Sequence, residues 1–348
     1  MCPPGTAETT YVTVSRPALA AGVATLVAVA LTAVPARAGV AHPLPGTACT
    51  AFPANNYWHA DVSRLPSDTR GPAWMANMSP TRKLHPDFGP SYGAQPVPYG
   101  LPITYVPSSH PKVSVSFTYA DESDQVGYPL GTDTQIEGGA NSTGDRHAVI
   151  VDTGTCRLYE LWNLHRTSSG SWWAGSGATW SLASDALRPA GWTSADAAGL
   201  AILPGLLRYD EVRAGSVDHA IRFTTDTTSR AYLWPARHQA GSTTDVAHYP
   251  PMGARFRLKA SFPISTYRAD TRVVLTAMKK YGLVLADNGS PWYFQGTADD
   301  AWPSGLLDEL KTIPASAFEA VSTAPLELTS SSARVRYHHG GYWLAILS

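Results

Sequence analysis

The chain has 348 residues with 26 basic and 27 acidic side chains, so its formal charge at pH 7 is −1. This balance argues against the strong positive field with which proteins bind nucleic acids or anionic membrane surfaces. Charged residues make up only 15% of the chain, whereas Gly, Pro, Trp and Tyr are abundant. Such a composition is typical of a turn-rich β protein.

The first 38 residues have the features of a secretory signal peptide. Arg16 precedes an apolar segment over residues 17–34, and Ala-Arg-Ala at 36–38 provides the small residues that signal peptidase requires. We therefore predict cleavage after Ala38 and a secreted, extracellular protein that has no membrane contact once it is cleaved. The alternative, an uncleaved anchor, is disfavoured because 18 apolar residues are at the short limit for a bilayer span.

Cleavage would leave two cysteines, Cys49 and Cys156. In an oxidising compartment each has only the other as an intramolecular partner, so we predict a disulfide between them; two unpaired thiols are the alternative. Two cysteines without clustered histidines show no zinc-binding spacing. We therefore expect no cofactor, although loop carboxylates leave a Ca²⁺ site open.

The chain after residue 38 begins with a lead segment and continues with strands. Residues 39–111 are dense in Pro and turn-forming residues, and we expect them to pack on the body, tied to it by Cys49. Apolar and polar residues alternate over 112–119, which predicts the first regular strand. Similar patterns predict further strands over 147–152, 157–164, 176–182, 217–223, 231–234 and 255–260.

Two helices interrupt the strands near the C-terminus. Apolar residues recur at helical spacing over 269–281, and Gly282 follows where a left-handed residue often ends a helix. A shorter helix is predicted over 304–311. Between the two helices, residues 283–286 and 292–295 predict a β-hairpin around a turn at 287–290.

No low-complexity linker divides the mature chain of about 310 residues. We predict a mainly β fold over residues 112–328, a single β-sandwich or jelly-roll-like domain with two peripheral helices. Residues 329–348 differ in composition and are predicted to be a variable tail. We expect a monomer.

Residues 187–224 combine turn residues, apolar anchors and ionisable groups, and we expect this segment to cross one end of the β core. Thr193 and Ser194 precede Asp196, so a hydroxyl can cap a short helical turn that ends at Gly199. His219 shares a face with apolar residues of the predicted strand over 217–223. An inward-facing His is more often a core residue than a catalytic one, and the sequence leaves both readings open.

Loop carboxylates are candidates for cleaving a glycosidic bond, which needs one protonated and one ionised carboxyl group on opposite sides of the bond. One loop carries Asp121, Glu122 and Asp124, and Glu137 and Asp145 lie on the next. Glu137 stands before two glycines in an uncharged stretch, where desolvation would raise its pKa. For each carboxylate, a solvated turn or a Ca²⁺ ligand is the alternative.

Three imidazoles, His147, His219 and His238, are candidate bases. A His beside a cation is what β-elimination from a uronate requires, because the base removes a proton while the cation offsets the carboxylate charge. Arg222, Arg237 and Arg255 are available as that cation. A structural or surface role is the alternative for each His.

Tryptophan offers flat rings that stack on sugars, and all eleven lie after residue 38. We predict substrate contacts from Trp192, Trp234, Arg237 and Trp292, with core packing as the alternative for each ring. No G-x-S-x-G elbow, P-loop or dinucleotide fingerprint occurs, which disfavours serine-nucleophile and nucleotide-dependent chemistry.

Four segments resemble a group of exported proteins of high-GC actinobacteria, over nearly the whole mature chain. They are WTSADAAGLAILPGLLRYDEV at 192–212, DHAIRF at 218–223, PPMGARFRLKAS at 250–261 and YGLVLADNGSPWYFQG at 281–296. The resemblance implies export and a single type of domain. It implies no activity and transfers no catalytic residue.

We therefore predict a secreted carbohydrate-active enzyme that cleaves a polysaccharide, a glycoside hydrolase in preference to a lyase. The catalytic candidates form two facing rims, with Glu137, Asp145 and His147 on one and Asp196, His219 and His238 on the other. The main alternative is a non-catalytic extracellular carbohydrate-binding protein.

Overall fold

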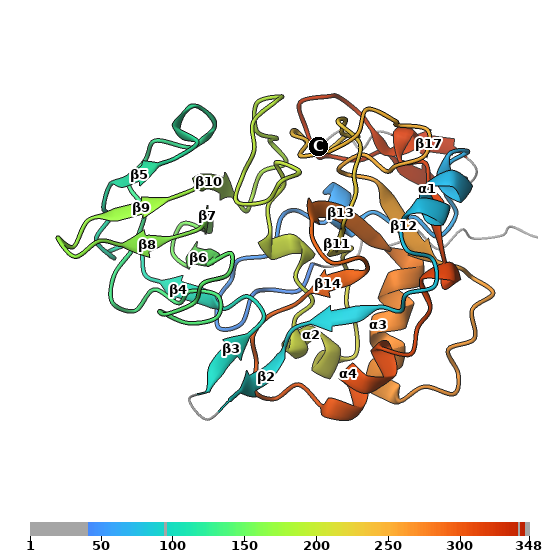
Figure 1. Cartoon of the computed structure of the whole chain (residues 1–348), viewed down its shortest axis with the longest axis horizontal. Coiled ribbons are helices and arrows are strands. Elements are labelled where there is room, and N and C mark those ends of the chain that lie inside the picture. Colours follow the sequence, from blue (N-terminus) through green and yellow to red (C-terminus); the bar gives the residue numbers. More distant parts are fainter. Residues whose placement is uncertain (1–40, 94–95, 340–341, 345–348) are drawn as a thin grey trace, which may run out of the picture. The chain divides into compact units, whose positions relative to one another are not determined.

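The computed structural model describes residues 41–93, 96–339 and 342–344 (Figure 1). The predicted signal peptide, residues 1–38, lies outside these ranges, so its cleavage stays a prediction. Within them strands hold more residues than helices do, which confirms the mainly β class. None of the helices described has the length and apolar character that a membrane span requires.

The largest sheet is mixed, and its six strands follow the order β1-β14-β11-β13-β12-β15. β11 runs parallel to β13 and β1 runs parallel to β14, and the remaining neighbours are antiparallel. The strands are β1 (His85–Asp87), β11 (Ile221–Thr225), β12 (Arg255–Leu258), β13 (Leu283–Asn288), β14 (Tyr293–Gln295) and β15 (Phe318–Val321).

The predicted hairpin over residues 283–295 is wrong, because β11 lies between β13 and β14. The connection passes over the end of β11: Gly289 N–H donates to Thr225 C=O at 2.9 Å and Trp292 N–H donates to Thr224 C=O at 3.0 Å. The turn residues are therefore bonded to a third strand, which a local hairpin pattern does not reveal.

The second sheet has four strands in the order β10-β7-β6-β4. Its members are β4 (Ile103–Val106), β6 (Ala148–Asp152), β7 (Arg157–Trp162) and β10 (Ser176–Ser181). β6, β7 and β10 are antiparallel neighbours, and β4 is parallel to β6. Smaller sheets contain β2 (Gly89–Tyr92) with β3 (Val97–Tyr99), β5 (Val115–Phe117) with β9 (Trp172–Ala174) and β8 (His165–Arg166), and β16 (Tyr337–His339) with β17 (Tyr342–Leu344).

A single jelly-roll-like sandwich is not confirmed, since the strands are distributed over several sheets. The predicted strand over 231–234 is reduced to an isolated bridge between Tyr232 and Met252.

The lead segment does more than cover the body, because two of its strands belong to the main sheets: β1 joins the six-stranded sheet and β4 joins the four-stranded sheet. In the predicted tail, Ala333 C=O accepts the N–H of Tyr57 at 2.8 Å, so this part of the tail is bonded to the body.

Four α-helices occur in the described ranges: α1 (Gly71–Asn77), α2 (Tyr209–Ala214), α3 (Ala269–Lys280) and α4 (Ser304–Leu310). α3 and α4 confirm the two predicted helices, and Gly282 after α3 has a φ of 74°. The expected total of two is wrong, because α1 and α2 are also helical. Both are short, at 7 and 6 residues, so they show little periodicity in the sequence.

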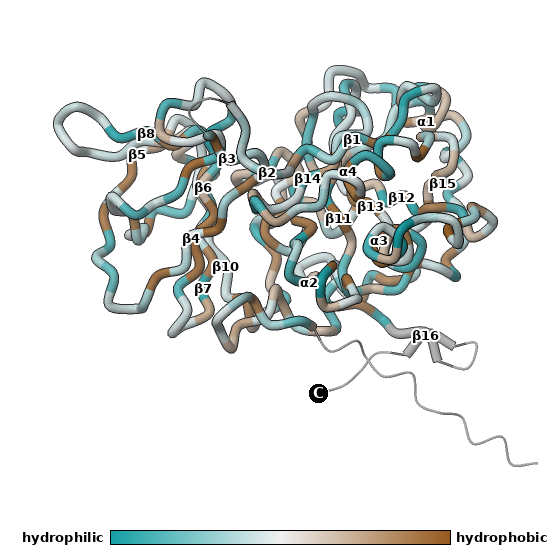
Figure 2. The backbone as a smooth tube through the Cα atoms, turned by 90° about the horizontal axis from the view of Figure 1, so that it is seen from below, coloured by the Kyte–Doolittle hydropathy of each residue, from teal (hydrophilic) through white to brown (hydrophobic). Residues whose placement is uncertain are grey.

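One hydrophobic core joins the two larger sheets. Val149 and Leu158 of the four-stranded sheet belong to the same buried cluster as Ile221 and Phe223 of β11. The opposite face of β6 and β7 packs on a smaller cluster with β5 and β9, so all five residues of β6 are buried. Apolar segments accordingly follow β4, β6 and β7 in Figure 2.

The predicted disulfide between Cys49 and Cys156 is present and spans 107 residues of sequence. It ties the lead segment to the turn between β6 and β7. The sulfur of Cys49 is held in the core, where the residue is 1% exposed.

Replacing both cysteines by serine is expected to lower the free energy of unfolding by about 4 kcal/mol, because a cross-link over about 100 residues restricts the unfolded chain. Urea unfolding of the wild type and of the Cys49→Ser/Cys156→Ser variant measures the difference. Wild-type protein kept in reductant is the matched control and should resemble the variant. Equal stabilities in all three samples would contradict the prediction.

Candidate active site

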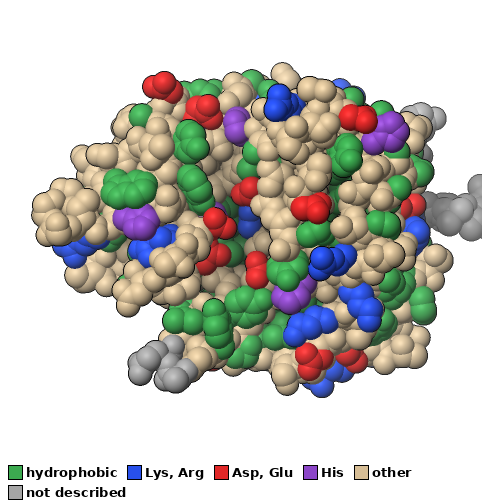
Figure 3. Space-filling model, in the orientation of Figure 1, with side chains coloured by type: hydrophobic (Ala, Val, Ile, Leu, Met, Phe, Trp, Pro, Cys, Tyr) green, Lys and Arg blue, Asp and Glu red, His purple; other side chains and the backbone are tan. Residues whose placement is uncertain are grey.

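A pocket of about 340 Å³ is lined by residues from both larger sheets. Trp162 ends β7, Asp287 lies near the end of β13, and residues 193–197 form one wall. Two further loops contribute Glu122 and His238. Figure 3 shows acidic side chains gathered around the hollow in the middle of this face.

The wall formed by residues 193–197 is shaped by hydroxyl groups. Ser194 Oγ accepts the N–H of Asp196 at 2.9 Å and donates to Leu200 C=O at 2.6 Å. Ser176 Oγ donates to the carbonyl of Ser194 at 2.6 Å. The predicted helical turn is replaced by a single non-helical turn, in which Gly199 N–H donates to Asp196 C=O at 3.0 Å, so the turn ends at Gly199 as predicted. The hydroxyl of Ser194 does cap the N–H of Asp196, as the sequence indicates.

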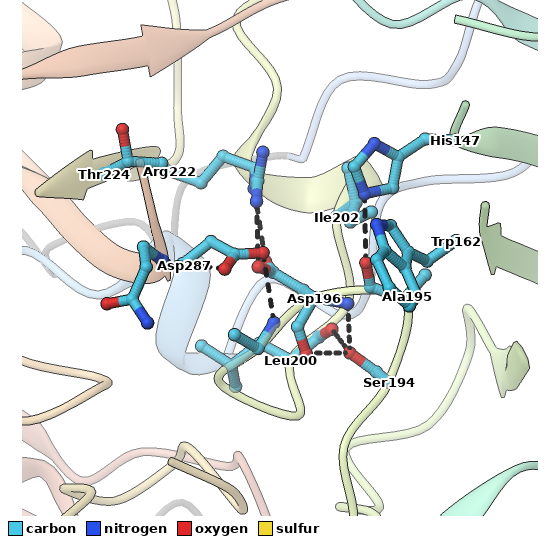
Figure 4. A network of polar contacts seen from close by, with 12 residues as sticks. His147, Trp162, Ser194, Ala195, Asp196, Leu200, Ile202, Arg222, Thr224 and Asp287 are labelled. Atoms are coloured by element: carbon cyan, nitrogen blue, oxygen red, sulfur yellow. Dashed lines mark hydrogen bonds and ion pairs between the residues drawn. The ribbon is translucent and has the colours of Figure 1, made fainter. Parts of the chain in front are cut away.

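A buried ion pair holds this wall to β11. Arg222 donates to both carboxylate oxygens of Asp196, at 2.8 and 3.2 Å (Figure 4). The two residues are 3% and 1% exposed, so water screens the pair very little. Burial by itself lowers the pKa of Arg222, but the charge of Asp196 more than offsets this and raises it. Burial raises the pKa of Asp196, and the charge of Arg222 and its hydrogen bonds offset this in part. The two-fold hydrogen bond with Arg222 fixes the position of Asp196.

A β-bulge turns Asp287 toward this ion pair. Phe223 pairs with Leu285, but the next residue of β11, Thr224, pairs with Asp287, so Ala286 is an extra residue in β13. Paired residues of neighbouring strands lie on the same face, and strand residues alternate between faces. The extra residue thus moves Asp287 to the face that carries Arg222 and Thr224. Ala198 N–H donates to the carbonyl of Ala286 at 2.8 Å, which docks the pocket wall on the bulge.

Asp287 retains a proton near neutral pH. Burial, followed by the negative charge of Asp196, raises the pKa of Asp287 to about 7. The two carboxyl groups are close enough to share a proton, which two charged carboxylates side by side favour. The N–H groups of Ala197 and Asn288 donate to its oxygens at 3.3 and 2.7 Å. Asp287 can therefore act as an acid.

Glu137 and His147 support the wall from behind and do not line the pocket. Glu137 Oε2 lies 2.7 Å from His147 Nδ1, and His147 Nε2 lies 3.1 Å from Ala195 C=O. Both imidazole nitrogens face acceptors, so both carry protons. Burial by itself lowers the pKa of His147, but Glu137 raises it to about 9. Burial by itself raises the pKa of Glu137, but His147 lowers it below its usual value, so the expected raised pKa is wrong.

Asp145 and two aromatic rings form the side of the pocket nearest the four-stranded sheet. Asp145 Oδ1 lies 3.5 Å from Trp162 Nε1. The ring centroids of Trp162 and Tyr119 are 6.2 Å apart at an interplanar angle of 34°, and Tyr119 is 51% exposed. These two rings provide the flat apolar surface that the sequence predicts at Trp192, Trp234 and Trp292.

Glu122 and His238 meet at the rim. Thr193 N–H donates to Glu122 Oε2 at 2.8 Å, and His238 Nδ1 donates to Ala197 C=O at 2.8 Å. The second nitrogen of His238 lies 3.8 Å from Glu122. Both side chains are thus anchored on the wall formed by residues 193–197.

Glu160 is a buried carboxyl group in β7 outside the pocket. It accepts the N–H groups of Ile202 and Leu203 at 2.8 Å, and burial raises its pKa to about 7. It anchors the start of the 3₁₀ turn Leu203–Gly205. The sequence reading missed it because it stands inside an apolar strand.

The structure brings together three of the six predicted catalytic residues at the pocket: Asp145, Asp196 and His238. Glu137 and His147 lie behind its wall. His219 is elsewhere: it is 1% exposed, and its Nε2 lies 3.0 Å from Glu211 of α2. His219 therefore has the surroundings of a core residue.

None of the predicted substrate-contact residues lines the pocket. Trp292 is fully buried, because its ring packs against Phe223 and Phe256 in the core. The guanidinium of Arg237 donates to the carbonyls of Arg188 and Ser330. The remaining two rings contact other parts of the chain: Trp192 lies beneath Arg188, and Trp234 donates to Ser332 C=O.

The sequence reading missed the catalytic potential of Asp287, which it placed in a hairpin turn. A usable signal was present, since Asp287 follows an apolar strand and ligands often bind at the carboxyl ends of parallel strands. Within the residues that the structure describes, no group of three or more His, Cys, Asp and Glu side chains is arranged to hold a metal ion.

Raising the pH is expected to destabilise the protein through His147. Its pKa is raised from 6.5 to about 9, so its contribution of about 3 kcal/mol is fully present below pH 6.5 and is lost as the pH rises through 9. In Glu137→Gln this loss should shrink, because the partner charge is gone. Glu160 and Asp287 titrate near 7 in both proteins, so the difference between the proteins isolates His147.

Urea unfolding at about pH 6 and pH 10 measures this effect, and NMR of the imidazole gives the pKa of His147 directly. Asp308→Asn, which removes an exposed carboxylate on α4, is the matched control and should behave like the wild type. An equal loss of stability in all three proteins would rule out the proposed role of the pair.

Comparison with other proteins leaves the site to be interpreted from its own chemistry. No protein-family model, no curated protein and no solved structure matches this chain. The arrangement of Asp287, Asp145 and the two rings is therefore the basis for assigning a function.

Proposed function

We propose that this protein is a secreted glycoside hydrolase that cleaves a polysaccharide. One observation carries the proposal: Asp287, an acid with a pKa of about 7, shares a pocket with Asp145, a carboxyl group on the loop that precedes β6 of the four-stranded sheet. Glycosidases need one protonated and one ionised carboxyl group around the scissile bond. Asp145 is exposed to solvent and takes the role of the second carboxyl group in this proposal.

In this mechanism Asp287 donates its proton to the leaving glycosidic oxygen. Asp145 then either attacks the sugar carbon or removes a proton from the attacking water, and its negative charge stabilises the oxocarbenium-like transition state. The Arg222–Asp196 pair is a positioning device. The guanidinium of Arg222 holds the carboxyl group of Asp196 beside Asp287, where burial and the charge of Asp196 together raise the pKa of Asp287.

The exposed ring of Tyr119 and the half-buried ring of Trp162 would stack on a sugar face next to Asp145. Elimination from a uronate is less well supported. No Lys or Arg is among the described lining residues, and the guanidinium of Arg222 is occupied by Asp196. A uronate carboxylate would therefore meet no free cation in the pocket.

Asp287→Asn is expected to lower the rate of cleavage by roughly 10²–10⁴-fold, because the amide cannot supply the proton. Wild-type activity should fall as the pH rises above about 7, since Asp287 then loses its proton. New reducing ends are measured on a panel of bacterial and plant polysaccharides, with Asp308→Asn as the control.

Full activity of Asp287→Asn would refute the assignment of the acid. If the folded wild type releases no reducing ends from any polysaccharide yet is retained on insoluble glycan, the alternative of a carbohydrate-binding protein replaces the hydrolase.

Trp162→Ala is expected to raise KM roughly tenfold with little change in kcat, since stacking holds the substrate equally in the ground and transition states. Trp162→Phe keeps a flat ring and should remain close to the wild type. Initial rates over a range of substrate concentrations separate the two constants. Equal effects of Ala and Phe would show that the ring does not contact the substrate.

A further inference from the structure

We infer that the pocket takes a saccharide that carries a free amino group, such as an oligomer of glucosamine. The inference rests on the proposed function for its site and names the class of substrate. It follows from the charge of the pocket wall together with the two rings on its side.

The pocket wall presents carboxyl groups without free cations. Glu122, Asp145 and Asp287 line it, and no Lys or Arg does so among the described residues. The one imidazole in the described wall is that of His238, whose Nδ1 is engaged by a backbone carbonyl.

The nearby cations are each bound to a carboxylate of their own, Asp196 within the wall and Glu137 behind it. Arg222 is paired with Asp196, and His147 is paired with Glu137. Their charges therefore cancel locally. Because Asp287 holds a proton near neutral pH, Asp145 and Glu122 are the carboxylates that face the pocket. A ligand that enters the pocket therefore meets carboxylates, which attract positively charged groups.

The rings complete a site for an ammonium group. Trp162 and Tyr119 border the same space as Asp145, and the faces of aromatic rings attract cations as well as stacking on sugars. An ammonium has three N–H donors, which carboxylates bind through charge-assisted hydrogen bonds. An N-acetylated sugar lacks this positive charge. A uronate carries a negative charge, which the carboxylates of the pocket repel.

Binding to three oligosaccharides of equal length tests the inference: oligomers of glucosamine, of N-acetylglucosamine and of a uronic acid. Calorimetry on the wild type and on Asp287→Asn should give at least tenfold tighter binding of the amino sugar than of the N-acetyl sugar. This preference should weaken with added salt, because the attraction is electrostatic. The uronate should show no measurable binding.

Variants that each remove one carboxylate show which residues cause the preference for the amino sugar. Glu122→Gln and Asp145→Asn should each weaken binding of the amino sugar at least threefold and leave binding of the N-acetyl sugar unchanged. Asp308→Asn removes an exposed carboxylate outside the pocket and should change neither. If all three variants weaken binding equally, the preference reflects the charge of the whole protein and the inference fails.

The inference and the hydrolase can fail separately. If the N-acetyl sugar binds as tightly as the amino sugar, the inference is overturned; release of reducing ends from a neutral glycan would still support the hydrolase, with the carboxylates serving catalysis alone. Preferential binding of the amino sugar without cleavage of any glycan supports the inference and overturns the hydrolase. Failure to bind any of the three saccharides overturns the inference.

Discussion

The buried ion pair between Arg222 and Asp196 is the interaction on which the site depends. It joins β11 of the six-stranded sheet to the wall formed by residues 193–197. Both side chains are excluded from water, so removing either one would leave an uncompensated buried charge at a cost of about 3–5 kcal/mol. Burial raises the pKa of Asp287, and the charge of Asp196, which the pair holds beside it, raises the pKa further.

Both sheets are needed to build the pocket. His147, which directly precedes β6, contacts the wall at Ala195, and the bulge in β13 binds Ala198, the residue that directly follows the wall. A shared hydrophobic core and the disulfide from Cys49 keep the sheets in one compact unit. The pocket is therefore positioned by polar contacts on a rigid apolar base.

The charged groups that hold the pocket wall in place differ from those that face the pocket. Arg222 is paired with Asp196 of the wall and His147 with Glu137 behind it, while Asp145 and Glu122 are left at the pocket surface. This separation explains how a protein with nearly equal numbers of acidic and basic residues has a negative pocket. The same negative wall suits an oxocarbenium-like transition state and a cationic sugar.

The sequence by itself determined the features that depend on local pattern or on elimination: the mainly β class, the helices α3 and α4, the Cys49–Cys156 bridge, and the presence of Asp145, Asp196 and His238 among the candidates. Only the tertiary structure decided the strand order, the bulge at Ala286 and the acidity of Asp287. The physical reason is that pairing partners and burial are set by residues distant in sequence. Asp287 becomes an acid only where folding removes water and places Asp196 beside it.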